Sequence, residues 1–384
     1  MSIPEVVVQV RVRGRHPWFY RKMVRKPERA LPAGGIVRAV DRDGRVIGTG
    51  FYNPRSELAL RIFSPGIVED APAHFVRALA AATQLREQTL GLPAVTNAWR
   101  VVHAEGDGFP GLVLDRLGDA YVAQLSTLGM QKVLEPLGEW LLQHHRGAKL
   151  LLQQDEDALK REGMERVPRP QPVAVEVHEH GLRYAVQAGG GHKTGFFADQ
   201  RDNRLMVRNL AKGRTVLDLC CNAGGFAMNA LAGKARSVVA ADLDEAAVEQ
   251  TRANLSRNQM RAEVVHADAF DLLRELEPGS KDLIVLDPPK WVRSKDELEL
   301  GLAKYRDLNR LAMEKLPPGG LLVTCSCSGS VSEDSFLRTL ADAAAQARRD
   351  LRVVAHRGAG PDHPFALECP ETRYLKVIVL QARG

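Results

Sequence analysis

The chain has 384 residues, of which 45% are hydrophobic and 26% charged. Its length suits two or three domains, and its composition is ordinary for a soluble globular protein. No apolar run approaches the ~20 residues of a membrane span, and the N-terminus lacks a signal-peptide pattern. The five cysteines do not form a disulfide framework. These features exclude membrane-embedded and disulfide-stapled secreted proteins and favour a reducing cytoplasm.

The net charge of +6 is concentrated near the N-terminus. Residues 1–72 hold 13 Lys and Arg against 7 Asp and Glu, whereas the remainder is balanced. Aromatic side chains interrupt this basic stretch, a pattern that can follow a phosphate backbone and stack on bases. A solvated basic face beside ordinary core aromatics is the alternative. The candidate RNA contacts are Arg11, Arg13, Arg15, Trp18, Arg21 and Lys22.

Two small domains are expected before the largest one. Residues 1–72 are expected to be a small all-β module of about five strands. Four of them can be located, over 6–12, 34–40, 46–52 and 58–63, and Asp41-Arg42-Asp43-Gly44 has the residue types of a hairpin turn. Residues 73–187 are expected to be a central α+β domain. Its predicted helices are 73–90 and 130–145, and its predicted strands are 100–103, 112–115, 121–125, 173–177 and 182–186.

Strand and helix patterns alternate through residues 188–384. The predicted strands are 215–219, 237–241, 262–266, 282–286, 320–325, 351–355 and 374–380. Helical segments between most of them predict a seven-stranded, mostly parallel α/β sheet. The last strand follows its predecessor without an obvious helix and is expected to run in reverse.

The first strand of this domain leads into a turn of small residues. Residues 215–226 read Thr-Val-Leu-Asp-Leu-Cys-Cys-Asn-Ala-Gly-Gly-Phe. Such a strand–turn–helix brings backbone N–H groups close to a ligand. Asp242 ends the next apolar run, 18 residues after Gly224. An acid at this offset is placed to bind ribose hydroxyls, so we expect a nucleoside here.

The spacing Gly-x-Gly-x-x-Gly of a dinucleotide site is absent, and Asp218 would repel phosphates. An acid there suits a cationic ligand, and S-adenosylmethionine carries an ammonium and a sulfonium. A glycine turn without a ligand is the alternative. The candidate cofactor contacts in this part are Asp218, Asn222, Gly224, Gly225, Phe226 and Asp242.

Two further segments are candidates for the same ligand. His192-Lys193-Thr194-Gly195-Phe196-Phe197-Ala198-Asp199-Gln200-Arg201 could cover a nucleoside, with Gln200 in the segment and Arg201 holding a carboxylate. Asp268 follows the strand 262–266 and could accept from an adenine amine. An ordinary surface loop is the alternative for each.

Asp287-Pro288-Pro289-Lys290 follows the fourth strand, where the sites of α/β sheets form. The prolines remove N–H donors, which leaves carbonyls and the Asp287 carboxylate to face a planar substrate. An acid there can hydrogen-bond the N3 and amino side of a cytosine, and Lys290 could contact RNA.

Thr324-Cys325-Ser326-Cys327-Ser328-Gly329 ends the fifth strand. A thiolate that adds to C6 of a pyrimidine makes C5 nucleophilic enough to accept a methyl group. Cysteine suits this role because its pKa of ~8.5 can be lowered locally. Cys327 is preferred as the nucleophile, whereas Cys220, Cys221 and Cys369 are expected to pack in the interior.

Over nearly its whole length, the chain resembles the bacterial RlmI-type 23S rRNA cytosine-5 methyltransferases. The matching residues are His16-Pro17-Trp18, Glu105-Gly106-Asp107-Gly108-Phe109-Pro110-Gly111, Gly191-His192-Lys193-Thr194-Gly195, Asp199-Gln200-Arg201, Asp287-Pro288-Pro289-Lys290, Ser326-Cys327-Ser328-Gly329 and Tyr374-Leu375-Lys376. The resemblance implies an N-terminal PUA domain, a central α+β domain and a Rossmann-like methyltransferase domain. It also implies Cys327 as nucleophile, Asp287 as the acid that orients the base, and S-adenosylmethionine at the glycine turn, Asp242 and Asp268. Cys325 inherits no role.

We therefore expect an S-adenosylmethionine-dependent enzyme that forms 5-methylcytosine in 23S rRNA, free or within an assembling large subunit. No metal and no membrane partner are expected, and the oligomeric state is open, with a homodimer as one option. Two alternatives remain: methylation of another rRNA base, such as 5-methyluridine, and a non-catalytic RNA-binding or ribosome-assembly factor.

Overall fold

The computed structural model describes residues 3–12, 14–190, 194–294 and 296–383. The chain divides into two compact units. Unit 1 comprises Met1–His178, Val186–Ala198 and Pro361–Thr372, and unit 2 comprises Glu179–Ala185, Asp199–Gly360 and Arg373–Gly384. Among the described residues, no helix combines the length and the apolar character that a membrane crossing needs.

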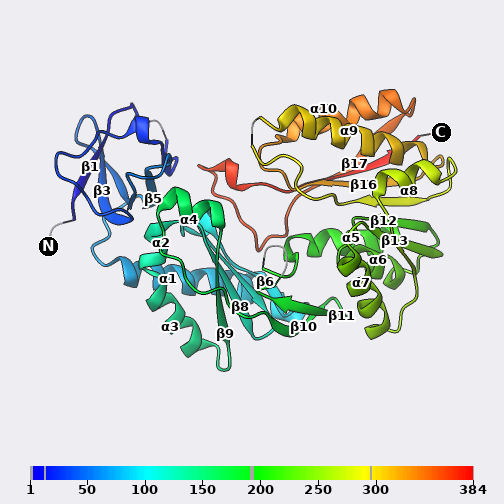
Figure 1. The fold of residues 1–384 in the computed structure, drawn as a ribbon, viewed down its shortest axis with the longest axis horizontal. Helices are drawn as coiled ribbons and strands as arrows, with labels where there is room; N and C mark the ends of the chain where they lie inside the picture. The colour runs from blue at the N-terminus through cyan, green and yellow to red at the C-terminus, as the bar shows by residue number, and fades with distance from the viewer. Residues whose placement is uncertain (1–2, 13, 191–193, 295, 384) are drawn as a thin grey trace. The chain divides into compact units, whose positions relative to one another are not determined.

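Unit 1 begins with a five-stranded sheet, as predicted. Its strands are β1 (Glu5–Val8), β2 (Trp18–Phe19), β3 (Gly35–Asp41), β4 (Val46–Tyr52) and β5 (Leu60–Ser64), in the order β1-β3-β4-β5-β2. Figure 1 labels β1, β3 and β5 of this sheet. The first strand ends at Val8 rather than Val12. Beyond it, Gln9 donates its backbone N–H to the carbonyl of Met23, which ends the short 3₁₀ helix Arg21–Met23, so the chain bonds to a helical turn instead of a strand.

A second, four-stranded sheet follows in the order β6-β7-β8-β9. Its strands are β6 (Ala98–His103), β7 (Leu112–Leu117), β8 (Ala120–Leu125) and β9 (Lys149–Gln154). Helices α1 (Ala71–Gln84), α2 (Leu128–Lys132), α3 (Leu134–His144) and α4 (Glu156–Glu162) accompany it, and β10 (Val173–Glu179) and β11 (Leu182–Ala188) form a separate two-stranded sheet. The predicted helix 130–145 is divided at Val133, and β9 and α4 were not predicted.

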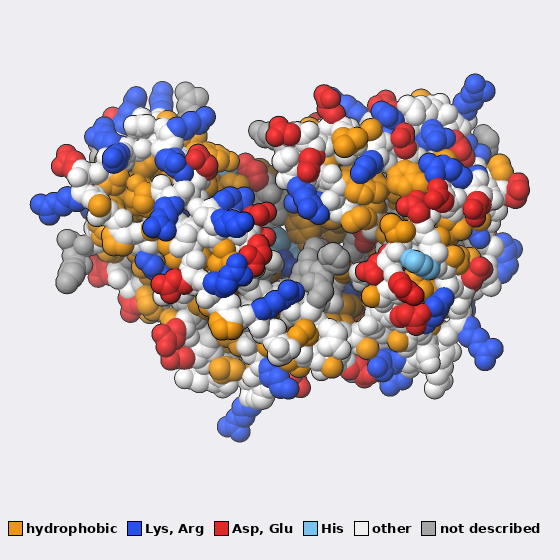
Figure 2. Space-filling view, viewed as in Figure 1, with side chains coloured by type: hydrophobic (Ala, Val, Ile, Leu, Met, Phe, Trp, Pro, Cys, Tyr) orange, Lys and Arg blue, Asp and Glu red, His pale blue; other side chains and the backbone are white. Residues whose placement is uncertain are grey.

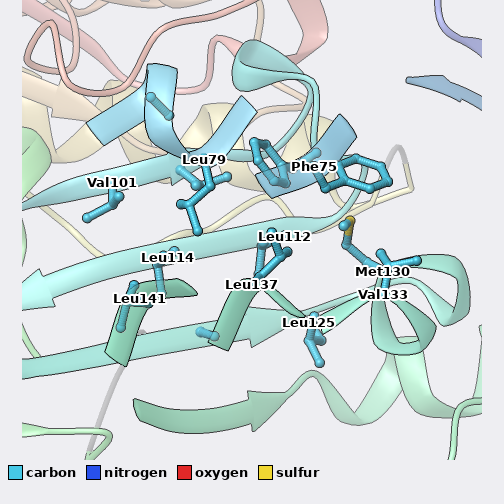
Figure 3. Packing of buried hydrophobic residues seen from close by; sticks show 14 of the residues in the cluster. Phe75, Leu79, Val101, Leu112, Leu114, Leu125, Met130, Val133, Leu137 and Leu141 are labelled. Atoms are coloured by element: carbon cyan, nitrogen blue, oxygen red, sulfur yellow. The ribbon is translucent and has the colours of Figure 1, made fainter. Parts of the chain in front are cut away.

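One hydrophobic core joins the first two sheets of unit 1. Phe51 and Phe63 from the N-terminal sheet stack with Phe75 of α1, with ring centroids 4.8–5.7 Å apart. Figure 3 shows Phe75 and Leu79 of α1 in the same cluster as side chains from β7 and α3. The expected boundary at residue 72 therefore crosses a shared core. Removing residues 1–72 would expose the apolar surface around Phe75.

A buried ionic network ties a distant segment into unit 1. α1 continues as a π-helical turn (Leu85–Thr89), which contains the fully buried Arg86. Its guanidinium contacts both carboxylate oxygens of Asp107, at 2.6 and 2.7 Å, and donates to the Asp362 carbonyl. The Asp362 carboxylate accepts from the Arg100 backbone N–H at 3.0 Å. These bonds hold the segment 361–372 in unit 1. In the sequence, this segment lies between the last two strands of unit 2.

Unit 2 is built on a seven-stranded sheet in the order β14-β13-β12-β15-β16-β18-β17. Its strands are β12 (Thr215–Leu219), β13 (Ser237–Asp242), β14 (Glu263–His266), β15 (Leu283–Leu286), β16 (Leu321–Ser326), β17 (Leu351–Arg357) and β18 (Lys376–Ala382). Neighbours from β14 to β16 pair in parallel, whereas β18 is antiparallel to both β16 and β17. The predicted seven strands and the reversed last strand are confirmed.

Helices cover both faces of this sheet (Figure 1). One face carries α5 (Arg201–Leu210), α6 (Gly225–Ala232) and α7 (Glu245–Arg257), and the other carries α8 (Ala269–Glu275), α9 (Leu298–Glu314) and α10 (Glu333–Gln346). Leu217 faces the α8–α10 side and Val216 the opposite side, as strand alternation requires. Because β12, β13, β15 and β16 are parallel, the loops after them meet at one edge of the sheet.

Candidate active site

The turn after β12 has the backbone conformation of a ligand cradle. Cys220, Asn222 and Gly224 have positive φ angles of 59°, 49° and 75°, and α6 begins directly afterwards. A Cβ at Gly224 would lie 2.8 Å from Thr251 Cγ2, so this position requires glycine. The result is a tight turn that leads directly into a helix, where backbone N–H groups can bind a ligand.

Asp242 lies at the end of β13 and is bonded to that turn. Its Oδ2 accepts from the Asn222 N–H at 2.8 Å, and its Oδ1 accepts from the Asp244 N–H at 3.0 Å. The next residue, Leu243, has an apolar side chain that is 65% exposed. An acid beside an exposed apolar side chain suits a ribose and its planar base. Leu243 was not predicted, because one leucine after a strand carries no distinctive signal.

Asp268 and Asp218 are tied to helix starts. The half-buried Asp268 caps α8, and its Oδ1 accepts from the N–H groups of Phe270 and Asp271. The fully buried Asp218 accepts from the Ala227 N–H at 2.9 Å. Burial, with smaller contributions from the nearby carboxylates of Asp287 and Asp242, raises the pKa of Asp218 to about 8. Three acids at one sheet edge would be stabilised by a cationic ligand.

Gln200 connects the predicted cover segment to Asp287. Its Nε2 donates to Asp287 Oδ2 at 3.0 Å, and its Oε1 accepts from Asn203 Nδ2 at 2.7 Å. Both Gln200 and Arg201 are almost fully buried, and the Arg201 Nε donates to Asp202. Phe226 is buried in the core beneath the turn. His192 and Lys193 of the cover segment lie outside the described residues.

The two cysteines of β16 have different surroundings. Cys325 is fully buried and packs with the core that contains Val377. Burial, followed by the charge of Asp287, raises the pKa of the Cys325 thiol well above its usual value. Cys327 lies beyond the end of the strand and is only half-buried. A thiol in the position of Cys325 stays protonated, whereas Cys327 lies at the carboxyl edge of the sheet, past the end of β16.

A hydrogen-bond network links the loops that carry Asp287 and Cys327. The Ser328 Oγ accepts from the Val292 N–H at 3.2 Å and lies 3.2 Å from the Tyr305 hydroxyl. Lys376 Nζ donates to the Ser328 carbonyl at 2.6 Å. Tyr305 was not predicted from the sequence, and Lys376 was named only among the residues that carry the family resemblance. Their roles depend on contacts between residues that are distant in sequence.

Comparison with known proteins identifies the family. The model for S-adenosylmethionine-dependent methyltransferases matches residues 147–367, and that for a PUA-like domain matches residues 8–65. The chain belongs to the S-adenosylmethionine-dependent methyltransferase family. Ribosomal RNA large subunit methyltransferase I of Shewanella denitrificans is 36% identical over 379 residues, which cover 95% of each chain. The Citrobacter koseri protein of that name is 35% identical and covers 94% of each chain.

Solved structures show the same fold. A candidate S-adenosylmethionine-dependent methyltransferase from Streptococcus mutans matches with a TM-score of 0.80 at 18% identity, covering 99% of this chain and all of that one. A candidate methyltransferase complexed with SAH has a TM-score of 0.81 at 19% identity and the same coverage. The predicted family, PUA-like domain, methyltransferase fold and S-adenosylmethionine cofactor are confirmed.

The predicted RNA contacts of this methyltransferase are mostly exposed. Arg11, Arg15, Arg21, Lys22 and Lys290 are exposed, whereas Arg13 lies outside the described residues. Trp18 is half-buried and donates its indole N–H to Glu105 at 2.9 Å, so its ring is held within unit 1.

The PUA-like domain also contains a basic groove of about 280 Å³. Arg25, Lys26 and Arg29 line it, together with Glu5 and Glu28. Figure 2 shows Lys and Arg side chains, in blue, around the N-terminal sheet. The three cations of the groove were part of the basic run in the sequence, but the groove itself depends on the fold.

His16, Cys369 and Glu371 are the one group in the described part of the chain that could hold a metal ion. The Trp18 backbone N–H donates to His16 Nδ1 at 3.2 Å, which places the imidazole proton on Nε2. Nε2 then donates to Glu371 at 3.2 Å. A metal would need the lone pair of Nε2, so this geometry favours a hydrogen-bonded pair over a metal site.

Proposed function

We propose that this methyltransferase forms 5-methylcytosine in 23S rRNA of the large ribosomal subunit. The observation that carries the proposal is the pairing of β15 with β16, which brings Asp287 and Cys327 to the ends of adjacent parallel strands. The names of the relatives support an rRNA substrate. A half-buried thiol and an acid that can bind a base, at the ends of neighbouring strands, support chemistry at C5 of a pyrimidine.

The residues at the carboxyl edge of β12 and β13 suit S-adenosylmethionine. Asp242 would bind the ribose hydroxyls, Leu243 would contact the adenine, and Asp268 would accept from its amine. Asn222, Gly224, Gly225 and Phe226 would supply the backbone of the cradle. Gln200, Arg201 and Asp218 are buried and would act on the cationic ligand and its carboxylate mainly through charge and positioning. Bound there, the cofactor supplies an electrophilic methyl group.

Cys327 would begin the reaction by forming a bond from Sγ to C6 of the cytosine. The electron pair of the C5–C6 double bond then becomes available at C5, which gains the methyl group. Loss of the C5 proton and departure of Sγ from C6 restore the double bond and the thiolate. Cysteine fits both halves of this cycle because its thiolate is a good nucleophile and a good leaving group.

Asp287 would hold the base in place. Its carboxylate can accept from the N4 amine of cytosine, and Gln200 orients that carboxylate by donating to Oδ2. A carboxylate equally accepts from N3–H of uracil. Formation of 5-methyluridine is therefore the second candidate, and the chemical identity of the product decides between the two.

The PUA-like domain would bind the RNA around the target base. Its basic groove can contact phosphates, while the target base leaves its stack to reach Cys327. We propose 23S rRNA as the partner, free or in an assembling subunit, in the cytoplasm. A homodimer is compatible with this role.

An RNA fragment with 5-fluorocytosine at the target tests the mechanism. Fluorine cannot leave as a proton, so the enzyme should remain covalently attached through Cys327, and mass spectrometry locates the adduct. An adduct on Cys325 would reverse the assignment. No adduct with an otherwise active enzyme would exclude the covalent C5 mechanism. Mapping modified nucleotides in rRNA from a deletion strain would identify the product and its position.

A non-catalytic assembly factor is the remaining alternative. Calorimetry with S-adenosylmethionine separates the two, because a protein that has lost catalysis has no need to bind the cofactor. Failure of the intact protein to bind it would favour the assembly role.

A further inference from the structure

Lys376 is a buried lysine close to Cys327. It is the first residue of β18, where it pairs with Ser326, and it is only 4% exposed. Its Nζ donates to the Ser328 carbonyl at 2.6 Å and to the Tyr374 carbonyl at 2.8 Å. The two bonds fix the ammonium group against the backbone that directly follows Cys327.

Neutral carbonyls only partly offset the cost of burying a cation. The charged or titratable groups that act on Lys376 are Cys327, Arg373, Glu333 and Lys290. Glu333 is already paired with Arg373 at 3.0 Å and with His356 at 3.2 Å. Of these four groups, the Cys327 thiolate is the one that remains to balance the ammonium. The phenol of Tyr305, also near Cys327, has a pKa raised to about 12 by burial and stays neutral.

We propose that Lys376 is a positioning residue that holds Cys327 as a thiolate. The inference rests on the proposed function, in which a thiolate is the form that attacks C6. The ammonium favours loss of the thiol proton to solvent, and its bond to Ser328 keeps the loop in place. In turn, burial lowers the pKa of Lys376 to about 8, and the Cys327 thiolate opposes that decrease.

This arrangement also distinguishes the two cysteines. Cys325 pairs with Val377 in the sheet and is enclosed by apolar side chains, where burial keeps its thiol protonated. Cys327 lies past the strand, in the loop that Lys376 anchors. A local cation, rather than the sequence around the two thiols, would select the nucleophile.

The test is the pH dependence of Cys327 alkylation by iodoacetamide, followed by peptide mass spectrometry in a Cys325→Ala background. Only the thiolate reacts, so the profile reports the pKa of Cys327 without RNA. Lys376→Met should slow alkylation at pH 7.5 about tenfold, which corresponds to a pKa rise of about one unit. Lys376→Arg, which keeps the charge, should restore most of the rate.

Lys315→Met is the matched control, because Lys315 is another buried lysine of unit 2 that donates to a backbone carbonyl, that of Leu276. It should leave the profile unchanged. Tyr305→Phe removes a contact to Ser328 but no charge, and should also leave the apparent pKa in place.

An unshifted profile in folded Lys376→Met protein would overturn the proposal, as would an equal shift in Tyr305→Phe. Alkylation needs neither RNA nor methyl transfer. A failure of the proposed function would appear instead as the wrong methylated base or as no fluorocytosine adduct, with the alkylation result still standing.

Discussion

The side-chain amide of Gln200 donates to the carboxylate of Asp287, with 3.0 Å between Nε2 and Oδ2. Asn203 donates to the other end of the same amide, which determines its orientation. Gln200→Glu would place two carboxylates in contact, and one of them would take up a proton. We expect methyl transfer at pH 7.5 to fall tenfold or more and to recover partly at lower pH. Steady-state rates across pH test this.

The matched control is Gln250→Glu. Gln250 is a half-buried glutamine of α7 whose amide donates to the Ala185 carbonyl at 3.0 Å, away from Asp287. Its pH–rate profile should equal that of the unmodified enzyme. Identical profiles for all three proteins would show that Gln200 does not position Asp287.

Asp242→Ala should weaken S-adenosylmethionine binding at least tenfold. Hydrogen bonds to a charged group contribute roughly 1.5–3 kcal/mol, and this carboxylate also holds the turn at Asn222. Calorimetry gives the dissociation constant. Asp244→Ala is the control, because Asp244 caps α7 by accepting from Ala246 and should affect stability more than affinity. Equal losses in both variants would contradict a ribose contact at Asp242.

Cys327→Ala should abolish methylation but retain cofactor binding. Cys325→Ala should keep substantial activity and lose a little stability, because it leaves a small cavity in the core. Methyl incorporation and thermal denaturation measure the two effects. Comparable activity in both variants would leave neither thiol as the nucleophile.

Arg25→Gln combined with Arg29→Gln should weaken RNA binding and make it less dependent on salt. Each lost phosphate contact should reduce the steepness of the plot of log association constant against log salt concentration by roughly one. Substitution is preferable to deletion because Phe51 and Phe63 belong to a shared core. Arg42→Gln with Arg45→Gln, exposed on the same domain but outside the groove, is the control. The same change of slope in both pairs would indicate a diffuse charge effect instead of a groove.

Asp218→Asn should stabilise the cofactor-free protein at pH 8. The folded-state pKa of about 8 lies above the unfolded value of roughly 3.9, so the folded state holds an extra proton between these pH values. Stability contributed by this group is therefore present at low pH and is lost as pH rises toward 8. Thermal unfolding of both proteins at pH 5 and pH 8 tests the sign. A larger benefit at pH 5 would contradict it.

The repeating pattern of unit 2 could be predicted because each strand is a short apolar run with helical segments beside it. Even the reversed direction of β18 followed from the missing helix before it. By contrast, β9 was not predicted, because Lys149–Gln154 mixes three leucines with polar residues and follows neither the alternation of a strand nor the 3.6-residue repeat of a helix. The stop of β1 at Val8 reflects pairing with Met23, which no local pattern reveals.

The candidate site divides in the same way. Asp242, Asp287 and Cys327 could be proposed from the sequence because each ends or follows an apolar strand and carries a reactive group, and their roles stay predictions. The contacts of Gln200 with Asp287 and of Lys376 with Ser328 join residues 87 and 48 positions apart. Asp218 shows what the sequence leaves out. An acidic residue at this position suggested a cationic ligand, but only the fold shows that Asp218 is fully buried and accepts from the Ala227 N–H.

The last strand of the chain is not at an edge of its sheet. β18 is inserted between β16 and β17, both made earlier, and it contributes Lys376 beside the Cys327 loop. β17 therefore has no neighbour in the sheet until β18 has been made. A chain truncated before β18 would lose Lys376 and leave β17 without a pairing partner. β18 thus joins the edge strand β17 to the sheet and places Lys376 against the Cys327 loop, so a single strand that is made late completes both.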